Sequence, residues 1–287
     1  MDINVAKNSG FCFGVKRAIE TVENLVNKGF KVCTLGDIIN NSQVVDKLKS
    51  QGVRVISSLK DLKPNEILVV RSHGVTKDIT EDIKLLKIKC VDATCPFVKK
   101  IHNVVERNSE NKKFLLIAGK ASHPEVVGIR SYFSGRSYVF SDLEDLKKIL
   151  KQDDFNGNGF VVSQTTFSSK KWENCINFIK KHFTNIAIYD TICNVTSLRQ
   201  EESEKLSKVS DLIIIVGGYM SSNTNKLKEI CSQNTNVIHV ENEKYLSTYN
   251  FKNFNRISIT AGASTPVETI FEVKNEIIRL LDVNSTY

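Results

Sequence analysis

The sequence repeats one local pattern three times: a cysteine that stands between a turn and a helix-like stretch. The copies read GFCFGVKRAIE, DATCPFVKKIH and DTICNVTSLRQ, and their cysteines are Cys12, Cys95 and Cys193. A strand-to-helix loop follows 28 residues after each cysteine, at Asn40, His123 and Ser221. Self-similarity of this kind indicates similar units that pack against one another.

A second set of loops continues the repeat with a small drift in length. RSHGV, SQTTF and AGAST carry His73, Thr165 and Ser264, which lie 61, 70 and 71 residues past the three cysteines. We therefore predict three units, 13–95, 96–193, and 194–287 together with 1–12. Each is short for an independent domain but adequate for units packed together.

Short β-branched runs alternate with amphipathic helical patterns along the whole chain. KVCTL, ILVVR, FLLIAG, GFVVSQ, LIIIVGG and ISITAG are examples of the strand-like runs. This alternation favours an α/β fold with mostly parallel sheets, in which ligands gather beyond the carboxyl ends of the strands. If the units surround a pseudo-threefold axis with those ends inward, the three repeated cysteines meet at the centre.

The remaining composition narrows the class of protein. The chain has seven cysteines, an odd number, and neither a signal-peptide pattern nor a membrane-length apolar stretch, so we expect a reducing, cytoplasmic setting without disulfides. Cys33, Cys175 and Cys231 lie in apolar patterns and are expected in the core. The formal charge of +8 is spread over helix faces among acidic residues, which favours anionic small molecules over nucleic acid, and we expect no membrane partner.

Three thiolates that converge on one point suit a soft metal, either zinc or an iron–sulfur cluster. Structural zinc normally has four ligands with short local spacing, whereas these cysteines are 83 and 98 residues apart. An electron-transfer [4Fe–4S] cluster usually has four cysteines. A cluster with three cysteines would leave one iron open to substrate oxygen, and the alternative is three unrelated buried cysteines.

The repeated loops contain groups that bind anions. Ser221, Ser222 and Asn223 open a helical stretch after a strand, where hydroxyls and free backbone N–H groups point at one place, although ordinary N-capping explains them as well. Ser264 has the same character. His73 and His123 lie in corresponding loops, where an imidazole can bind phosphate or move a proton.

Glu125 and Thr165 are candidates for chemistry at a substrate hydroxyl. Burial and nearby negative charge would raise the pKa of Glu125 and suit it to deliver a proton, unless it is only a first-turn glutamate favoured by the helix dipole. Thr165, in SQTTFSS, can supply a short polar contact to the substrate.

Taken together, GFCFGV, RSHGV, DATCP, HPE, QTT, DTIC, SSN and TAGAS resemble the 4-hydroxy-3-methylbut-2-enyl diphosphate reductase (IspH/LytB) family over nearly the whole chain. The resemblance implies a trefoil of three α/β units around one [4Fe–4S] cluster. It also implies the last reductive step of the non-mevalonate (MEP) isoprenoid pathway, which yields isopentenyl and dimethylallyl diphosphates.

The resemblance assigns roles to individual residues. It makes Cys12, Cys95 and Cys193 the cluster ligands, with the substrate hydroxyl oxygen on the open iron. It places Glu125, Thr165 and His123 at the chemistry. The implied substrate contacts are Asn40, His73, His123, Thr165, Ser221, Ser222, Asn223 and Ser264.

Two departures from the family pattern lie near this proposed anion pocket. Asn40 stands where the family ordinarily has a histidine, and Tyr219-Met220 stands where Lys-Asn is common. A paralogue acting on a different allylic alcohol or anion is therefore one alternative, and a zinc-stabilised basic nucleic-acid-binding protein is another. Ferredoxin or flavodoxin is the implied electron donor.

Overall fold

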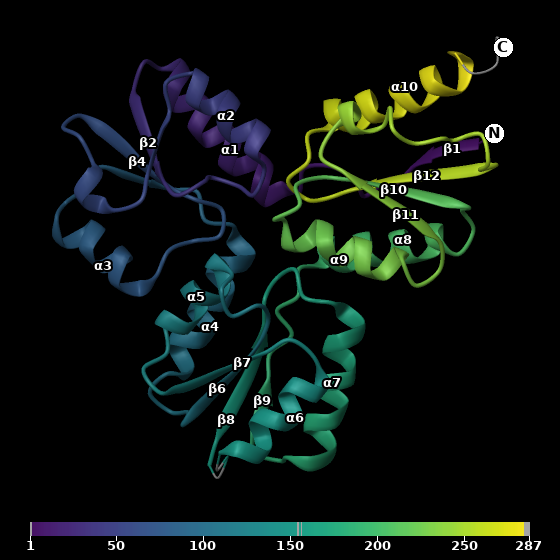
Figure 1. Ribbon diagram of the computed structural model, residues 1–287. Helices are drawn as coiled ribbons and strands as arrows, with labels where there is room; N and C mark the ends of the chain where they lie inside the picture. The colour runs from purple at the N-terminus through teal and green to yellow at the C-terminus, as the bar shows by residue number, and fades with distance from the viewer. Residues whose placement is uncertain (1, 154, 156, 284–287) are drawn as a thin grey trace. The chain divides into compact units, whose positions relative to one another are not determined.

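The computed structural model describes residues 2–153, 155 and 157–283, and within them three four-stranded parallel sheets are covered by helices (Figure 1). The strands are β1 Asp2–Val5, β2 Lys31–Leu35, β3 Arg54–Ile56, β4 Glu66–Val70, β5 Cys90–Asp92, β6 Phe114–Ala118, β7 Arg136–Phe140, β8 Gly159–Ser163, β9 Ile186–Ile188, β10 Leu212–Val216, β11 Asn236–Val240 and β12 Arg256–Ala261.

Helices connect most successive strands, as the alternating sequence pattern predicts. They are α1 Phe13–Asn27, α2 Ser42–Ser50, α3 Lys77–Leu85, α4 Pro96–Asn108, α5 Pro124–Ser131, α6 Leu143–Gln152, α7 Ser169–His182, α8 Asn194–Ser207, α9 Ser222–Cys231 and α10 Val267–Val283, with short 3₁₀ turns at Leu59–Asp61 and Glu243–Tyr245. Among these helices, none combines the length and apolarity needed to cross a membrane.

The three sheets share one strand order. They read β3-β2-β4-β5, β7-β6-β8-β9 and β11-β10-β12-β1, and every neighbouring pair is parallel. In each sheet the fourth strand leads directly to a repeated cysteine: β5 to Cys95, β9 to Cys193 and β1 to Cys12. The prediction of an α/β fold built from three similar units is confirmed.

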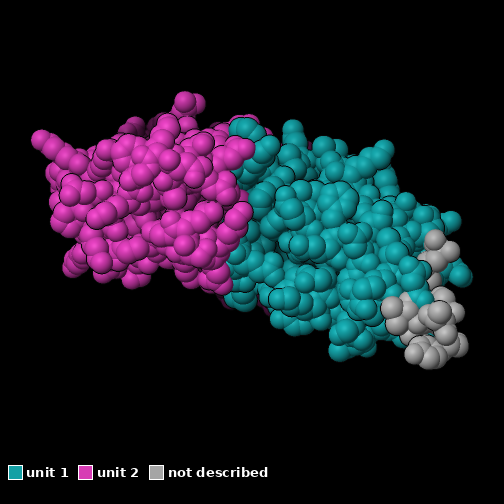
Figure 2. Space-filling view, turned by 90° about the horizontal axis from the view of Figure 1, so that it is seen from above, with its two compact units in different colours: residues 1–16, 40–44, 194–287 teal, residues 17–39, 45–193 magenta. Residues whose placement is uncertain are grey.

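The N-terminal residues belong to the last sheet, because β1 pairs with β12 in the register Asp2–Arg256 to Val5–Ile259. By packing, the chain divides into two compact units, coloured separately in Figure 2. Unit 1 is 1–16, 40–44 and 194–287, and unit 2 is 17–39 and 45–193, which includes two of the sheets. The boundaries 13–95, 96–193 and 194–287 with 1–12 stay a prediction.

The central strands explain why these sheets form. Every residue of β4, β6, β8 and β10 is buried, as expected for parallel strands covered by helices on both faces. The strand DINV and the strand CVD were not predicted. Neither contains a fully buried residue, so their sequences lack the apolar run that marks the central strands.

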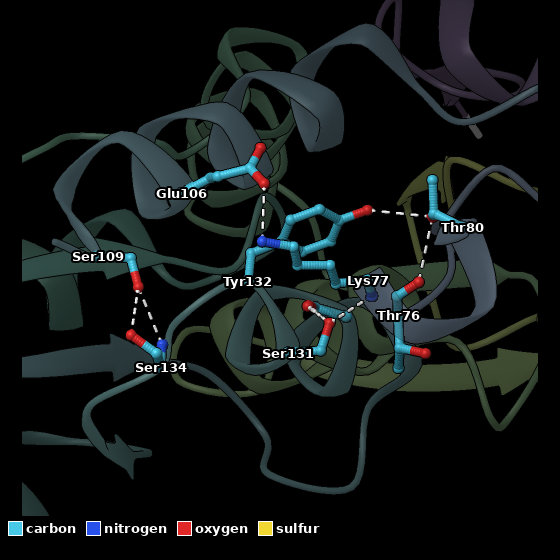
Figure 3. Close-up of polar contacts among 9 residues, drawn as sticks. Thr76, Lys77, Thr80, Glu106, Ser109, Ser131, Tyr132 and Ser134 are labelled. Atoms are coloured by element: carbon cyan, nitrogen blue, oxygen red, sulfur yellow. Dashed lines mark hydrogen bonds and ion pairs between the residues drawn. The ribbon is translucent and has the colours of Figure 1, made fainter. Parts of the chain in front are cut away.

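Within unit 2, polar contacts join α3 to α4 and α5 (Figure 3). Lys77 Nζ lies 3.0 Å from Glu106 Oε1, and the Lys77 backbone N–H donates to Ser131 Oγ at 2.9 Å. The hydroxyls of Thr80 and Tyr132 are 3.2 Å apart. A pocket of about 480 Å³ lies beside these contacts, and none of the predicted site residues lines it.

Candidate functional site

Each repeated cysteine lies where a helix begins. Cys95 is the N-cap of α4, while Cys12 and Cys193 directly precede α1 and α8. All three are partly exposed, and Cys33 and Cys175 are buried, with no exposed surface. The sequence-based separation of candidate ligands from core cysteines agrees with this difference in exposure.

The backbone N–H of each repeated cysteine donates to a backbone carbonyl in the loop RSHGV, SQTTF or AGAST of its own sheet. Cys12 binds Ala263 O at 3.1 Å, Cys95 binds Ser72 O at 2.9 Å, and Cys193 binds Thr165 O at 3.0 Å. These loops carry Ser264, His73 and Thr165. The repeat seen in the sequence is therefore a repeat in hydrogen bonding, which ties each candidate ligand to a candidate substrate residue.

The loops that contain Asn40, His123 and Ser221 also share one backbone hydrogen bond. Gly36, Gly119 and Gly217 each donate a backbone N–H to the last residue of the neighbouring strand, at Ile56, Phe140 and Val240, over 2.8, 2.9 and 2.9 Å. Four positions after each glycine stand Asn40, His123 and Ser221. Their equivalence, inferred from the 28-residue offset, is thus visible in the backbone.

In unit 1, the N-terminus of α9 forms one part of the candidate site. Ser221 is the N-cap, and its Oγ accepts from Thr224 N at 3.3 Å, so the serine hydroxyl proton can be donated to a ligand. Asn223 is only 4% exposed, and neither polar atom of its amide has a partner among the described residues. A buried amide without a protein partner can bind a ligand or water, and the first turn of a helix suits an anion.

Asn40 and Ser264 lie together in the same unit. Ser264 Oγ donates to Asn40 O at 3.1 Å, and Asn41 Nδ2 donates to Ser264 O at 2.8 Å. The loop before α9 contains Tyr219-Met220, the second departure from the family pattern. There, Tyr219 rests on the His239 ring with centroids 4.6 Å apart, while its backbone N–H donates to Glu241 Oε1 at 3.1 Å.

In unit 2, two histidine rings lie edge to face with centroids 5.4 Å apart: His73, after β4, and His123, the N-cap of α5. His123 Nδ1 accepts from Glu125 N at 3.2 Å, so the neutral ring has its proton on Nε2. Burial lowers the pKa of His73 to about 3 and that of His123 to about 4, helped by the Arg71 charge. Both rings are neutral hydrogen-bonding groups at pH 7.

Glu125 is 2% exposed and bound entirely by Thr165. Thr165 N donates to Glu125 Oε1 at 2.6 Å, and Thr165 Oγ1 donates to Oε2 at 2.8 Å. Burial raises the pKa of Glu125 to about 7, and the two bonds from Thr165 oppose the rise. The predicted direction of the shift agrees with this value, and the carboxyl group can hold or release a proton near neutral pH.

Burial also shifts the pKa values of the three core thiols. Burial raises the pKa of Cys33 and Cys175 to about 11 and that of Cys231 to about 12, which favours the protonated thiol at neutral pH. Cys12, Cys95 and Cys193 are partly exposed at the starts of helices, where the backbone dipole favours an anionic ligand. This donor set suits a thiolate-bound metal or cluster.

The predicted site residues are divided between the two compact units. Unit 1 contains Cys12, Asn40, Ser221, Ser222, Asn223 and Ser264. Unit 2 contains His73, Cys95, His123, Glu125, Thr165 and Cys193. The meeting of the three cysteines at one point stays a prediction.

Arg199 is a buried residue that the sequence analysis missed. It donates from α8 to two backbone carbonyls of unit 1, at Gly10 and Ala261. A signal was present, because α8 contains buried polar residues at positions i, i+3, i+4, i+7 and i+11, namely Thr196, Arg199, Gln200, Ser203 and Ser207. A polar stripe at helical spacing can mark a buried face as surely as an apolar one.

Fold and site together define an α/β protein with candidate metal-binding thiols beside anion-binding loops. Comparison with known families makes this specific: the family model described as LytB protein matches residues 3–278. The chain belongs to the LytB protein family.

Curated relatives and solved structures agree with this family. The 4-hydroxy-3-methylbut-2-enyl diphosphate reductase of Caldanaerobacter subterraneus subsp. tengcongensis is 39% identical over 282 residues, covering 96% of this chain and 96% of its own length. The protein of that name from Alkaliphilus oremlandii is 40% identical over 284 residues, covering 98% and 100%.

Two solved structures have the same fold. That of the E-1-hydroxy-2-methyl-but-2-enyl-4-diphosphate reductase from Plasmodium falciparum gives a TM-score of 0.88 at 31% identity, covering 96% of this chain and 87% of the other. A structure of (E)-4-hydroxy-3-methyl-but-2-enyl diphosphate reductase, described as the terminal enzyme of the non-mevalonate pathway, gives 0.68 at 36% identity, covering 97% and 100%. These matches do not support the paralogue or the zinc-stabilised nucleic-acid-binding protein.

Proposed function

We propose that this chain is a 4-hydroxy-3-methylbut-2-enyl diphosphate reductase, the activity for which its relatives are named. Two electrons and two protons remove the allylic hydroxyl as water and give isopentenyl and dimethylallyl diphosphates. One observation carries the proposal: the N–H of each repeated cysteine is bound to a loop that carries a candidate substrate residue. Such coupling is expected where a metal centre and its substrate share one site.

Cys12, Cys95 and Cys193 would hold one [4Fe–4S] cluster per chain. When bound, the cluster supplies electrons and a Lewis-acidic iron that has no protein ligand. The supporting observation is that these thiols are partly exposed at helix starts, whereas Cys33, Cys175 and Cys231 are buried.

Within each unit, the predicted substrate residues would offer polar groups to the diphosphate. Ser221, Ser222, Asn223, Ser264 and Asn40 provide hydroxyls, amides and helix N-terminal N–H groups from unit 1. The orphaned amide of Asn223 supports an anion there. His73 and His123 of unit 2 add neutral donors, since the His123 proton lies on Nε2.

Glu125 holds the proton for the departing hydroxyl. With its pKa near 7, the carboxyl is partly protonated at neutral pH, and the Thr165 hydroxyl lies 2.8 Å from Oε2. Thr165 therefore links the Glu125 carboxyl to a substrate hydroxyl and orients both. One proton leaves with the hydroxyl as water, and the second ends on carbon.

The three predicted units, 13–95, 96–193 and 194–287 with 1–12, would surround the cluster in a pseudo-threefold trefoil. The shared strand order of the three sheets supports this arrangement. Ferredoxin or flavodoxin in the cytoplasm would supply the electrons, and the positive net charge suits such an acidic partner.

An anaerobic assay with reduced viologen tests the function. Cluster-loaded chain should turn over hydroxymethylbutenyl diphosphate but not the corresponding alcohol without phosphate. Cys95→Ser, prepared in parallel, should lose turnover because it removes a ligand. Turnover of the free alcohol alone would contradict the proposal and favour a different substrate.

Asn40→His tests the anion pocket in the same assay. A histidine there would add a charge-assisted bond to the diphosphate and lower KM by about tenfold, with kcat little changed. Met220→Asn is the matched control, because Met220 is 84% exposed. An unchanged KM in Asn40→His would remove position 40 from the diphosphate site.

A further inference from the structure

Arg199 lies at the junction of two functional segments of unit 1. Its side chain is buried, with 3% of the residue exposed, and it bridges two backbone carbonyls. Nη2 donates to Gly10 O at 2.8 Å, and Nη1 donates to Ala261 O at 3.0 Å. Gly10 is two residues before Cys12, and Ala261 is three residues before Ser264.

The same helix holds the segment before Cys12 at a second point. The Glu202 carboxylate accepts from the backbone N–H groups of Lys7 and Asn8 at 2.7 and 2.8 Å, and from Asn8 Nδ2 at 2.8 Å. Segment 6–12 is therefore held by an arginine and a glutamate three positions apart on α8. This helix begins at Asn194, directly after Cys193.

The backbone conformation from Gly10 to Cys12 is restricted once these bonds form. Gly10 has φ +90°, in the left-handed region, and an added Cβ would meet Ile270 Cδ1 at 3.4 Å. Two residues later, Cys12 N donates to Ala263 O at 3.1 Å. The turn at Gly10 and the Arg199 bridge thus determine where the Cys12 thiol emerges relative to the Ser264 loop.

We propose that Arg199 is a positioning residue that sets the Cys12 thiol and the Ser264 hydroxyl in one fixed geometry. The inference rests on the proposed function for the roles of Cys12 and Ser264. The bridge requires an arginine, because a planar guanidinium can donate to two carbonyls at once in fixed directions. A lysine has one ammonium group on a flexible stem and cannot keep both bonds in that geometry.

Arg199→Lys in the metal-free, reduced chain tests the positioning directly. The rates of alkylation of Cys12 and Cys95 by iodoacetamide are measured by peptide mass spectrometry. Loss of one hydrogen bond should loosen the turn and raise the Cys12 rate about fivefold relative to Cys95, which lies in the other unit. An unchanged ratio of the two rates would overturn the proposal.

Arg256→Lys is the matched control, because Arg256 is an exposed arginine of the same unit that donates to one backbone carbonyl, Val209 O, at 3.0 Å. The Cys12 to Cys95 ratio should stay native in this variant. An equal rise in both arginine variants would show a general loosening of unit 1 and would also overturn the proposal.

Iron release and kinetics extend the test to the loaded chain. Arg199→Lys should release iron to a chelator faster than the native chain under anaerobic conditions, and it should raise KM as well as lower kcat. If Arg199→Lys does not fold, Glu202→Gln on the partly exposed side of α8 should show the same changes at smaller size. Native alkylation and iron release in that variant would overturn the proposal.

The proposed function and the positioning role of Arg199 can be refuted separately. If the native chain takes up no iron and sulfide, the proposed function fails, while the alkylation ratio still reports on the positioning. If the native chain is loaded and active but the variants alkylate, hold iron and bind substrate as it does, only the role of Arg199 fails.

Discussion

At the scale of single residues, the fully buried thiols differ in exposure from the repeated cysteines. Cys33, Cys175 and Cys231 have no exposed surface, and burial raises their pKa values to about 11 or 12. Cys12 and Cys95 are partly exposed at helix starts. Full burial therefore makes thiolate formation costly at Cys33, Cys175 and Cys231.

Serine substitutions separate these groups experimentally. Cys95→Ser should abolish uptake of a stable cluster, while Cys33→Ser should retain iron and lose about 1–3 kcal/mol of stability, because a hydroxyl replaces a thiol in an apolar core. Iron and sulfide analysis after anaerobic reconstitution, with urea unfolding of the metal-free chains, gives both quantities. Equal iron loss in the two variants would refute the assignment of ligands.

The Glu125 carboxyl predicts a pH dependence of stability with a definite sign. Its folded pKa of about 7 lies above the unfolded value, so the folded chain holds the extra proton between about pH 4.5 and 7. The stabilisation is complete below this window and is lost as pH rises through it. Glu125→Gln removes this dependence.

The comparison of native and Glu125→Gln chains isolates this one group, since the histidine titrations are common to both. Between pH 4.5 and 8 the native chain should lose about 3 kcal/mol of unfolding free energy relative to the variant. Urea unfolding of metal-free protein at several pH values measures this difference. A constant difference across the range would mean that Glu125 has an ordinary pKa.

At the scale of elements, close packing determines where the α9 loop can lie. A Cβ placed on Gly262 would be 2.1 Å from Thr224 Oγ1 and 3.3 Å from Thr224 Cβ. Thr224 follows Ser221 to Asn223 in the first turn of α9. The absence of a side chain at Gly262 therefore lets α9 approach the loop that carries Ser264.

Gly262→Ala should displace the start of α9, weaken substrate binding and destabilise the chain by about 1–3 kcal/mol through overpacking. Thr224→Ala in the same chain removes the clashing hydroxyl and should restore part of the loss. A double-mutant cycle of unfolding free energies and KM values measures the coupling. Additive effects of the two changes would show that this contact does not position α9.

Much of the element order could be predicted because buried parallel strands are continuous apolar runs. LIIIVGG and FLLIAG correspond to β10 and β6, which are buried along their whole length. The strands β1 and β5 could not be recognised, because their short sequences lack such a run and owe their place to pairing with β12 and β4. Tertiary pairing, rather than local propensity, decides such segments.

The loops of the candidate site could be predicted, because the sequence repeat marks equivalent strand ends in the three units. Cys12, Cys95 and Cys193 follow from it directly. The bond between Thr165 and Glu125 could not be predicted, since it joins residues 40 positions apart whose contact depends on the packed sheet. The role of Arg199 also required the structure, because the residues that it joins are distant in sequence.

At the scale of the whole molecule, the net charge bears on the proposed protein electron donor. A formal charge of +8 should speed association with an acidic ferredoxin or flavodoxin, and salt should screen the attraction. The rate of reduction by such a protein should fall about tenfold or more between 0.02 and 0.5 M salt, while reduction by a small viologen changes less. Stopped-flow measurement of both rates at several salt concentrations tests this.

The proposed reductase activity is tested most directly by a single-turnover reaction. Anaerobic, cluster-loaded and chemically reduced chain is mixed with one equivalent of hydroxymethylbutenyl diphosphate, and the quenched mixture is analysed by mass spectrometry. We expect isopentenyl and dimethylallyl diphosphates to form with loss of the allylic oxygen. Recovery of unchanged substrate from fully loaded, reduced protein would contradict the proposed function.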